Sequence, residues 1–243
     1  MLLKNKVYND LVLNIKPGIY LVDKPSGPSS HDIVNYFRKK SGIKRVGHCG
    51  TLDPLASGLL IILVSREYTR KQTLYLKKDK EYLVEAVLGI ETDSYDQTGR
   101  IVKEIPWEKL KEINKKDLQK ILPEFKGQIE QTVPIFSAVK IKGQKLYQKA
   151  RRGELVNLPS RLIEIKKLTL KKFQKDVSKQ KINFELLVNC SSGTYIRSLI
   201  HDLGKKLGCG ATVTVLRRTK IDKFSVKKAN KLLLSEFKMD WDN

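Results

Sequence analysis

The stretch that decides the fold is Gly47-His48-Cys49-Gly50-Thr51-Leu52-Asp53-Pro54-Leu55-Ala56-Ser57, followed by an apolar run over 58–64. The run is continuous and of strand length, which is typical of a buried strand. Glycines and a proline bound the loop before it, so Asp53 presents its carboxylate from a tight turn, where chemistry is most expected. Asp-Pro is also an ordinary turn dipeptide, so a purely structural role for Asp53 stays open.

The net charge of the chain points to a polyanionic partner. The 243 residues include 48 Lys and Arg against 26 Asp and Glu, a formal net charge of +22. The basic residues occur in runs at 77–80, 140–152, 166–175 and 217–220, which predicts a folded protein with a broadly basic surface. A charge so far from zero favours an anionic partner such as nucleic acid. For any single run, lysines that only solvate an exposed face are the alternative.

Cysteine and histidine usage predicts neither a disulfide framework nor a metal site. The three cysteines lack a C-x-x-C spacing and the three histidines stand far apart. The glycine-rich loop lacks the pattern of a nucleoside triphosphate cradle. No stretch has the apolar length needed to cross a bilayer, and the N-terminus lacks a secretory pattern. A reduced, cytoplasmic protein is therefore expected.

Hydrophobic periodicity predicts a mixed α+β body with one protruding arm. Residues 133–160 are rich in basic residues and poor in periodic apolar positions, which favours a mobile segment suited to gripping a ligand. No repeat or linker interrupts the sequence, so one domain over 1–243 is expected. Strands are predicted over 18–22, 59–64, 82–88, 182–190 and 213–215. Helices are predicted from Ser29 to a stop at Gly42, between 64 and 82, and over 114–122, 196–207 and 228–237. A polar loop is predicted over 91–99.

Arg197 breaks a local rule of helix electrostatics. It falls in the first turn of a predicted helix, where the helix dipole disfavours a cation. Such exceptions often mark function, and a guanidinium facing Asp53 would orient that carboxylate and keep it ionised. A surface arginine is the alternative. Tyr82 shares a strand face with apolar residues and Tyr195 flanks an apolar helix stripe, so both are core or site residues on pattern alone.

Five blocks, in order along nearly the whole chain, resemble the motifs of the TruB family of tRNA pseudouridine synthases. The second block, extended by Leu60, fits the family signature G-H-x-G-T-L-D-P-x-A-x-G-x-L. The blocks are Asp23-Lys24-Pro25-Ser26-Gly27 with Ser29-Ser30; Gly47 to Leu59; Lys80-Glu81-Tyr82; Pro134-Ile135-Phe136-Ser137-Ala138-Val139-Lys140 with Tyr147 and Ala150-Arg151-Arg152-Gly153; and Cys190 to Leu199.

The resemblance implies the pseudouridine-synthase fold, a mixed, mainly antiparallel sheet flanked by helices, with the 133–160 insertion gripping RNA. It implies Asp53 as the catalytic aspartate, Arg197 as its salt-bridge partner, and Tyr82 and Tyr195 as the aromatic lining of a uracil pocket. The remaining implied substrate or RNA contacts are Leu216, His48, Lys24, Lys140, Arg151 and Arg152.

The implied reaction is isomerisation of uridine 55 in the T-loop of tRNA to pseudouridine. It needs neither a metal nor an organic cofactor, and the expected partner is the tRNA elbow, bound by a monomer. The chain is expected to lack the PUA-like C-terminal domain of many bacterial relatives. Two alternatives stay open: a tRNA-folding chaperone with incidental or lost catalysis, and the same chemistry on another structured or guide-directed RNA.

Overall fold

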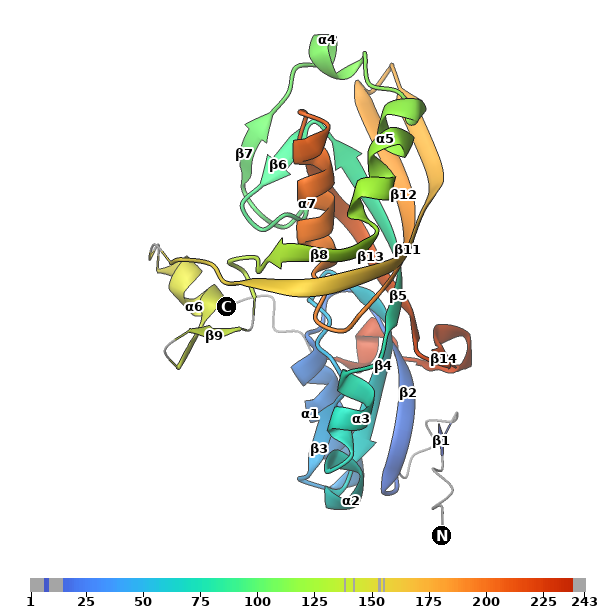
Figure 1. Cartoon of the computed structure of the whole chain (residues 1–243). Helices are drawn as coiled ribbons and strands as arrows, with labels where there is room; N and C mark the ends of the chain where they lie inside the picture. The colour runs from blue at the N-terminus through green and yellow to red at the C-terminus, as the bar shows by residue number, and fades with distance from the viewer. Residues whose placement is uncertain are drawn as a thin grey trace. The chain divides into compact units, whose positions relative to one another are not determined.

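The chain folds into two compact units. The computed structural model describes residues 7–8, 15–137, 139–141, 143–152, 154 and 156–237. One unit comprises Met1–Tyr82 with Leu216–Asn243, and the other comprises Leu83–Val215. Strands β5 (Lys80–Leu88) and β13 (Ala211–Ile221) contribute residues to both (Figure 1).

The first unit is built around β4 (Ser57–Val64), whose neighbour changes along its length. β2 (Gly18–Lys24) pairs antiparallel with all but the first residue of β4. On its other side, β3 (Val46–His48) pairs with the end of β4, whereas β13 pairs parallel with its beginning. The loop between β3 and β4, which carries Asp53, thus lies where one neighbour gives way to the other. Three short strands complete the sheet: β1 (Val7–Tyr8), β14 (Phe224–Ser225) and β15 (Asn230–Lys231).

Both faces of β4 are buried, which explains its uninterrupted apolar sequence. Leu60, Ile62 and Val64 pack in one cluster with residues of α1 (Ser30–Ser41). Leu59, Ile61 and Leu63 pack in a second cluster that includes Tyr75 of α3 (Gln72–Leu76). Full burial of such a side chain contributes about 1.5–3 kcal/mol. A second short helix, α2 (Arg66–Thr69), precedes α3.

Helix α1 begins and ends where the sequence predicts. Ser29 is the N-cap and forms a reciprocal capping box with Asp32, and three apolar residues of the helix are buried. Gly42 ends the helix at φ 68°, a left-handed conformation that glycine adopts without steric cost.

The second unit contains a sheet in the order β13-β5-β12-β11-β8. β12 (Lys181–Cys190) alternates strictly between buried and more exposed residues, as predicted. The long strand β11 (Ser160–Asp176) pairs antiparallel with β8 (Gly127–Thr132) through its first part and with β12 through the rest. Helix α7 (Ile196–Lys206) buries its apolar stripe and lies beside β8 (Figure 1). The unit also contains β6 (Ile90–Thr92), β7 (Ile101–Glu104), α4 (Trp107–Leu110), α5 (Lys115–Ile121) and the 3-10 helix η1 (Leu122–Phe125).

The predicted arm contains two short strands, β9 (Lys140–Ile141) and β10 (Gln144–Lys145), and helix α6 (Leu146–Arg151). Figure 1 shows α6 and β9 standing off the ends of β8 and β11. The arm is therefore a hairpin followed by a helix.

Three predictions of secondary structure are corrected. Residues 228–237 do not form one helix, because Asn230–Lys231 pair with β2 as β15, between the 3-10 helices η2 (Val226–Lys228) and η3 (Leu234–Glu236). The loop predicted over 91–99 begins inside β6, which pairs with β7. The single helix expected before β5 is two short ones. The fold class is confirmed as α+β with a mostly antiparallel sheet. Within the described ranges, no helix has the length and apolar character needed to span a membrane.

Candidate active site

The Asp53 loop is fastened to the segment that joins β2 to α1. Pro54 C=O accepts hydrogen bonds from Gly27 N–H at 2.8 Å and from Lys24 Nζ at 3.3 Å. Ser30 Oγ donates to Leu52 C=O at 2.9 Å and accepts from Leu52 N–H at 2.8 Å. Hydrogen bonds to the residues on both sides of Asp53 therefore fix the backbone that carries it, although its loop has no regular secondary structure.

Lys24 is a structural cation beside this loop. Its side chain is 0% exposed, and Nζ also donates to the carbonyls of Pro28 at 2.7 Å and Pro25 at 2.8 Å. Burial, partly opposed by the negative charge of Asp53, lowers the pKa of Lys24 from 10.5 to about 8. In this structure the ammonium group of Lys24 holds the loop, and its assignment as an RNA contact stays a prediction.

Arg218 is a second buried cation, which the sequence placed in a surface run. It is 1% exposed, and its guanidinium donates to Leu59 C=O at 2.7 Å and Gly50 C=O at 3.0 Å. Gly58, at φ 104°, allows the backbone of Arg218 to pair closely with β4, since a Cβ there would lie 2.3 Å from the Arg218 carbonyl oxygen. Arg218 thus connects both ends of the 50–59 segment.

Lys80 is also buried, and its Nζ donates to two backbone carbonyls at 2.6 Å. The prediction that the basic runs at 77–80 and 217–220 lie on the surface is therefore wrong for Lys80 and for Arg218.

His48 lies at the end of β3, partly buried, and is electrically neutral near pH 7. Burial, together with the positive charge of the neighbouring Arg218, lowers its pKa from 6.5 to about 4. Its Nδ1 is buried and has no hydrogen-bond partner among the residues that the structure describes. His48 is therefore available as an uncharged ring rather than as a cation.

Tyr82 and Leu216 are both buried in the first unit, at 8% and 6% exposure. Leu216 and Arg218 lie on the same face of β13, because alternate residues of a strand share a face. Arg217 points the other way and forms a bidentate ion pair with Asp23 at 2.7 and 3.0 Å. This forked pairing ties β13 to β2 across β4, which lies between them in the sheet.

In the second unit, the first turn of α7 carries Arg197, which is 4% exposed. Its Nη1 donates to Ser94 C=O at 2.6 Å and lies 3.6 Å from an Asp96 carboxylate oxygen. Its Nη2 donates to Phe136 C=O at 2.9 Å. A surface arginine is excluded, and these contacts offset the unfavourable position at the helix start. The predicted pairing of Arg197 with Asp53 joins residues of different units and stays a prediction.

Asp96 is a buried residue of this neighbourhood that the sequence analysis missed. One carboxylate oxygen accepts from Ser94 Oγ at 2.9 Å, Thr98 N–H at 3.0 Å and Thr98 Oγ1 at 2.6 Å. Bonds from Asp to the chain two residues on are typical of Asx-turns, so the pattern Ser94-x-Asp96-x-Thr98 was the available signal. It predicts a turn, but only the fold shows that the turn faces Arg197.

The other predicted contacts of the second unit differ in exposure. Tyr195 is the N-cap of α7, and the guanidinium of Arg161 lies 5.2 Å from its ring centroid. Lys140 and Arg152 are exposed on the arm, where Arg152 Nε donates to Glu154 at 2.6 Å. Arg151 belongs to α6, but its side chain lies outside the described part of the structure.

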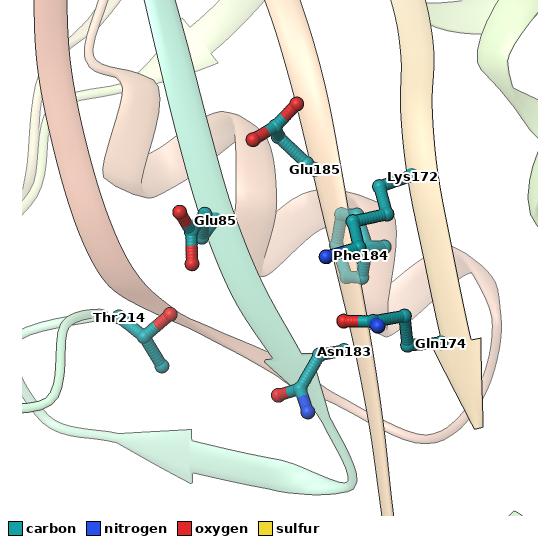
Figure 2. A pocket seen from close by; sticks show the side chains of 7 residues that line it. All are labelled: Glu85, Lys172, Gln174, Asn183, Phe184, Glu185 and Thr214. Carbon is teal, nitrogen blue, oxygen red and sulfur yellow. The ribbon is translucent and has the colours of Figure 1, made fainter. Parts of the chain in front are cut away.

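A shallow pocket on the sheet of the second unit is separate from all predicted site residues. Figure 2 shows its lining side chains, which come from β5, β11, β12 and β13 and enclose about 80 Å³. The residues that line this pocket are Glu85, Lys172, Gln174, Asn183, Phe184, Glu185 and Thr214.

Among the residues described, no group of three or more His, Cys, Asp or Glu side chains is arranged to hold a metal ion.

Comparisons with known proteins identify the family. Residues 38–196 match the TruB family pseudouridylate synthase N-terminal domain, and residues 197–240 match the tRNA pseudouridylate synthase B C-terminal domain. The tRNA pseudouridine synthase B of Chlamydia pneumoniae is 40% identical, covering 89% of this chain and 88% of its own length. That of Endomicrobium trichonymphae is 42% identical, covering 87% and 88%. The chain belongs to the TruB family of pseudouridine synthases, and the predicted enzyme class, an isomerase, is confirmed.

A solved structure supports the fold. The crystal structure of a Cbf5-Nop10-Gar1 complex contains a chain that superimposes with a TM-score of 0.65 at 27% identity. The match covers 88% of this chain but 52% of the solved one, so this chain spans about half of that protein's length.

Proposed function

We propose that this protein isomerises uridine 55 in the T-loop of tRNA to pseudouridine, with Asp53 as the attacking carboxylate. The proposal rests on the anchoring of Asp53 by the 24–30 segment, together with relatives that are named tRNA pseudouridine synthase B. We expect it to act as a cytoplasmic monomer, without a metal or an organic cofactor.

The reaction exchanges one bond for another within the nucleoside. The bond between N1 of uracil and C1′ of ribose breaks, the base turns, and C5 bonds to C1′; C5 loses a proton and N1 gains one. Asp53 attacks either C1′ or C6 of uracil, and Arg197 pairs with the carboxylate to keep it ionised. Tyr82, Tyr195 and Leu216 line the uracil site in this proposal.

The nucleotide must leave its stack before the carboxylate can reach it, at a cost of a few kcal/mol. Stacking on an aromatic ring contributes about 1–3 kcal/mol per base and offsets that cost. The lowered pKa of His48 supports stacking as its role, because a neutral ring cannot serve as a cation for phosphate. Exposed cations such as Lys140 and Arg152 supply the phosphate contacts.

The test is to incubate the protein with unmodified tRNA transcript and to map pseudouridine. Wild type is expected to modify one T-loop uridine, whereas Asp53→Asn should give no product and bind tRNA as wild type does. Asp222→Asn, an exposed change in the same unit, is the matched control and should leave the activity intact. Product from Asp53→Asn would remove Asp53 from the mechanism. Binding and refolding of tRNA without any product from wild type would favour the chaperone alternative.

A further inference from the structure

Gln131 of β8 forms a two-way hydrogen-bonded pair with the backbone of Tyr195. Gln131 is 1% exposed. Its Oε1 accepts from Tyr195 N–H at 2.7 Å, and its Nε2 donates to Tyr195 C=O at 3.0 Å. A side-chain amide supplies one acceptor and one set of donors from the same group, so it can satisfy both polar groups of one residue. The pair resembles the exchange of bonds between facing residues of antiparallel strands.

The start of α7 depends on external partners. Tyr195 is the N-cap residue, with φ −97° and ψ 107°, and its side chain makes no capping bond. The first N–H groups of a helix have no partner within it. Tyr195 C=O accepts the first helical bond from Leu199 N–H at 3.1 Å as well as the bond from Gln131. Gln131 therefore fixes the residue from which the helix begins.

Two further contacts join the same pair of segments. Ser198 Oγ donates to Thr132 C=O at 3.2 Å, and Arg197 Nη2 donates to Phe136 C=O at 2.9 Å. Since β8 ends at Thr132, these bonds tie the beginning of the 133–160 arm to the first turn of α7. Of the side chains in this set, that of Gln131 is the one that holds both the N–H and the C=O of a single residue.

We propose that Gln131 is a positioning residue for the isomerase reaction: its amide fixes the Tyr195 peptide and thereby sets the orientation of the Tyr195 ring and the Arg197 guanidinium. The inference rests on the proposed function, which assigns those two side chains to the uracil site. Arg197 follows Tyr195 by two residues in a rigid helix, so a shift of the N-cap moves its guanidinium. A misplacement of about 1 Å can cost about 100-fold in rate.

The decisive variant is Gln131→Met, which keeps the length of the side chain and removes both its donor and its acceptor. Gln128→Met is the matched control, because Gln128 is exposed on the same strand. The measurements are the single-turnover rate of pseudouridine formation at saturating tRNA and, separately, the tRNA dissociation constant. We expect the rate of Gln131→Met to fall about 10- to 100-fold while the dissociation constant changes less than about threefold. The control should match wild type in both.

A normal rate for Gln131→Met would overturn the proposal. So would a loss confined to tRNA affinity, because positioning acts on the bound complex. If Gln131→Met does not fold, Gln131→Asn replaces it. This variant keeps the amide but shortens its reach by one methylene. A normal rate, or a loss confined to tRNA affinity, would overturn the proposal in this variant too.

Hydrogen exchange separates this proposal from the proposed function. The Tyr195 amide should exchange faster in Gln131→Met than in wild type and in Gln128→Met, whether or not the protein modifies tRNA. Faster exchange with no product from wild type would refute the proposed function while the anchoring of α7 stands. Unchanged exchange at Tyr195 in Gln131→Met would overturn the positioning role by itself.

Discussion

The cations around the Asp53 loop and those on the arm have opposite environments. Lys24 and Arg218 are 0% and 1% exposed, and their charged groups donate to backbone carbonyls of the loop or its flanks. Lys140 and Arg152 are exposed, and Arg152 bonds to side chains of the arm itself. The first kind shapes a rigid loop, whereas the second remains open to water and to phosphates. The basic residues that give the chain its high net charge therefore have two different roles, and the burial of each side chain shows which role it has.

The largest expected effect tests the buried kind. Arg218→Met should lower the free energy of unfolding by about 3 kcal/mol, since hydrogen bonds to charged groups contribute about 1.5–3 kcal/mol each and two carbonyls lose their donor. Urea denaturation measures the change. The exposed Arg70→Met should stay within about 0.5 kcal/mol of wild type. Similar values for the two variants would abolish the distinction between the regions.

A comparable effect is expected from pH acting on His48, in the same region. Its native pKa of about 4 lies below the unfolded value of about 6.5, so above pH 6.5 neither state binds the proton. As the pH falls from 6.5 to 4, the unfolded state takes up a proton that the native state refuses, and stability falls by about 3 kcal/mol. His48→Gln should show a correspondingly shallower loss in urea titrations over this range. Equal slopes for wild type and variant would contradict the buried, neutral imidazole.

Lys24→Met should lower the free energy of unfolding less than Arg218→Met does. It should slow pseudouridine formation more than Arg218→Met does. Removing the ammonium leaves carbonyl oxygens with fewer donors, but it also removes the cost of burying a charge, so the net loss should be about 1–2 kcal/mol. Because Pro54 loses one of its two donors, the loop loosens and pseudouridine formation should slow by about tenfold. Lys39→Met, an exposed change in α1, is the control. A Lys24→Met enzyme as fast as the control would show that the loop does not need this cation.

The smallest effect is expected on the arm. Arg152→Gln should weaken tRNA binding modestly and reduce the slope of log affinity against log salt by about 0.7–0.9, the value for one phosphate contact. Lys140→Gln should act likewise, and the double variant should lose about twice as much. Filter-binding titrations at several salt concentrations measure these slopes. Slopes identical to wild type would mean that these cations do not meet phosphates.

Local sequence patterns predicted most of the elements around the site. The helix start at Ser29, the stop at Gly42 and the strand over 182–190 each depend on neighbours in the chain, and each is confirmed. The apolar run of β4 likewise has the burial that its sequence predicts. The helix predicted at 228–237 failed because pairing of Asn230–Lys231 with β2 overrides local preference.

The site was predicted less evenly. Motif resemblance singled out Asp53 and Arg197 by their order in the chain, and their pairing stays a prediction. Gln131 and Asp96 were missed, because both are polar residues in polar stretches whose burial depends on distant segments.

The sequence by itself determined the family, the α+β class and the Asp53 loop, because motifs and periodicity are written in the order of the residues. Only the tertiary structure decided which cations are buried and which side chains hold the first turn of α7. Those outcomes depend on segments that are far apart in sequence and close in the fold, such as Gly58 beside Arg218 and Gln131 beside Tyr195. A buried polar group needs a hydrogen-bond partner, and that partner can come from any segment that the fold places beside it. The order of residues along the chain does not show which segments lie close together.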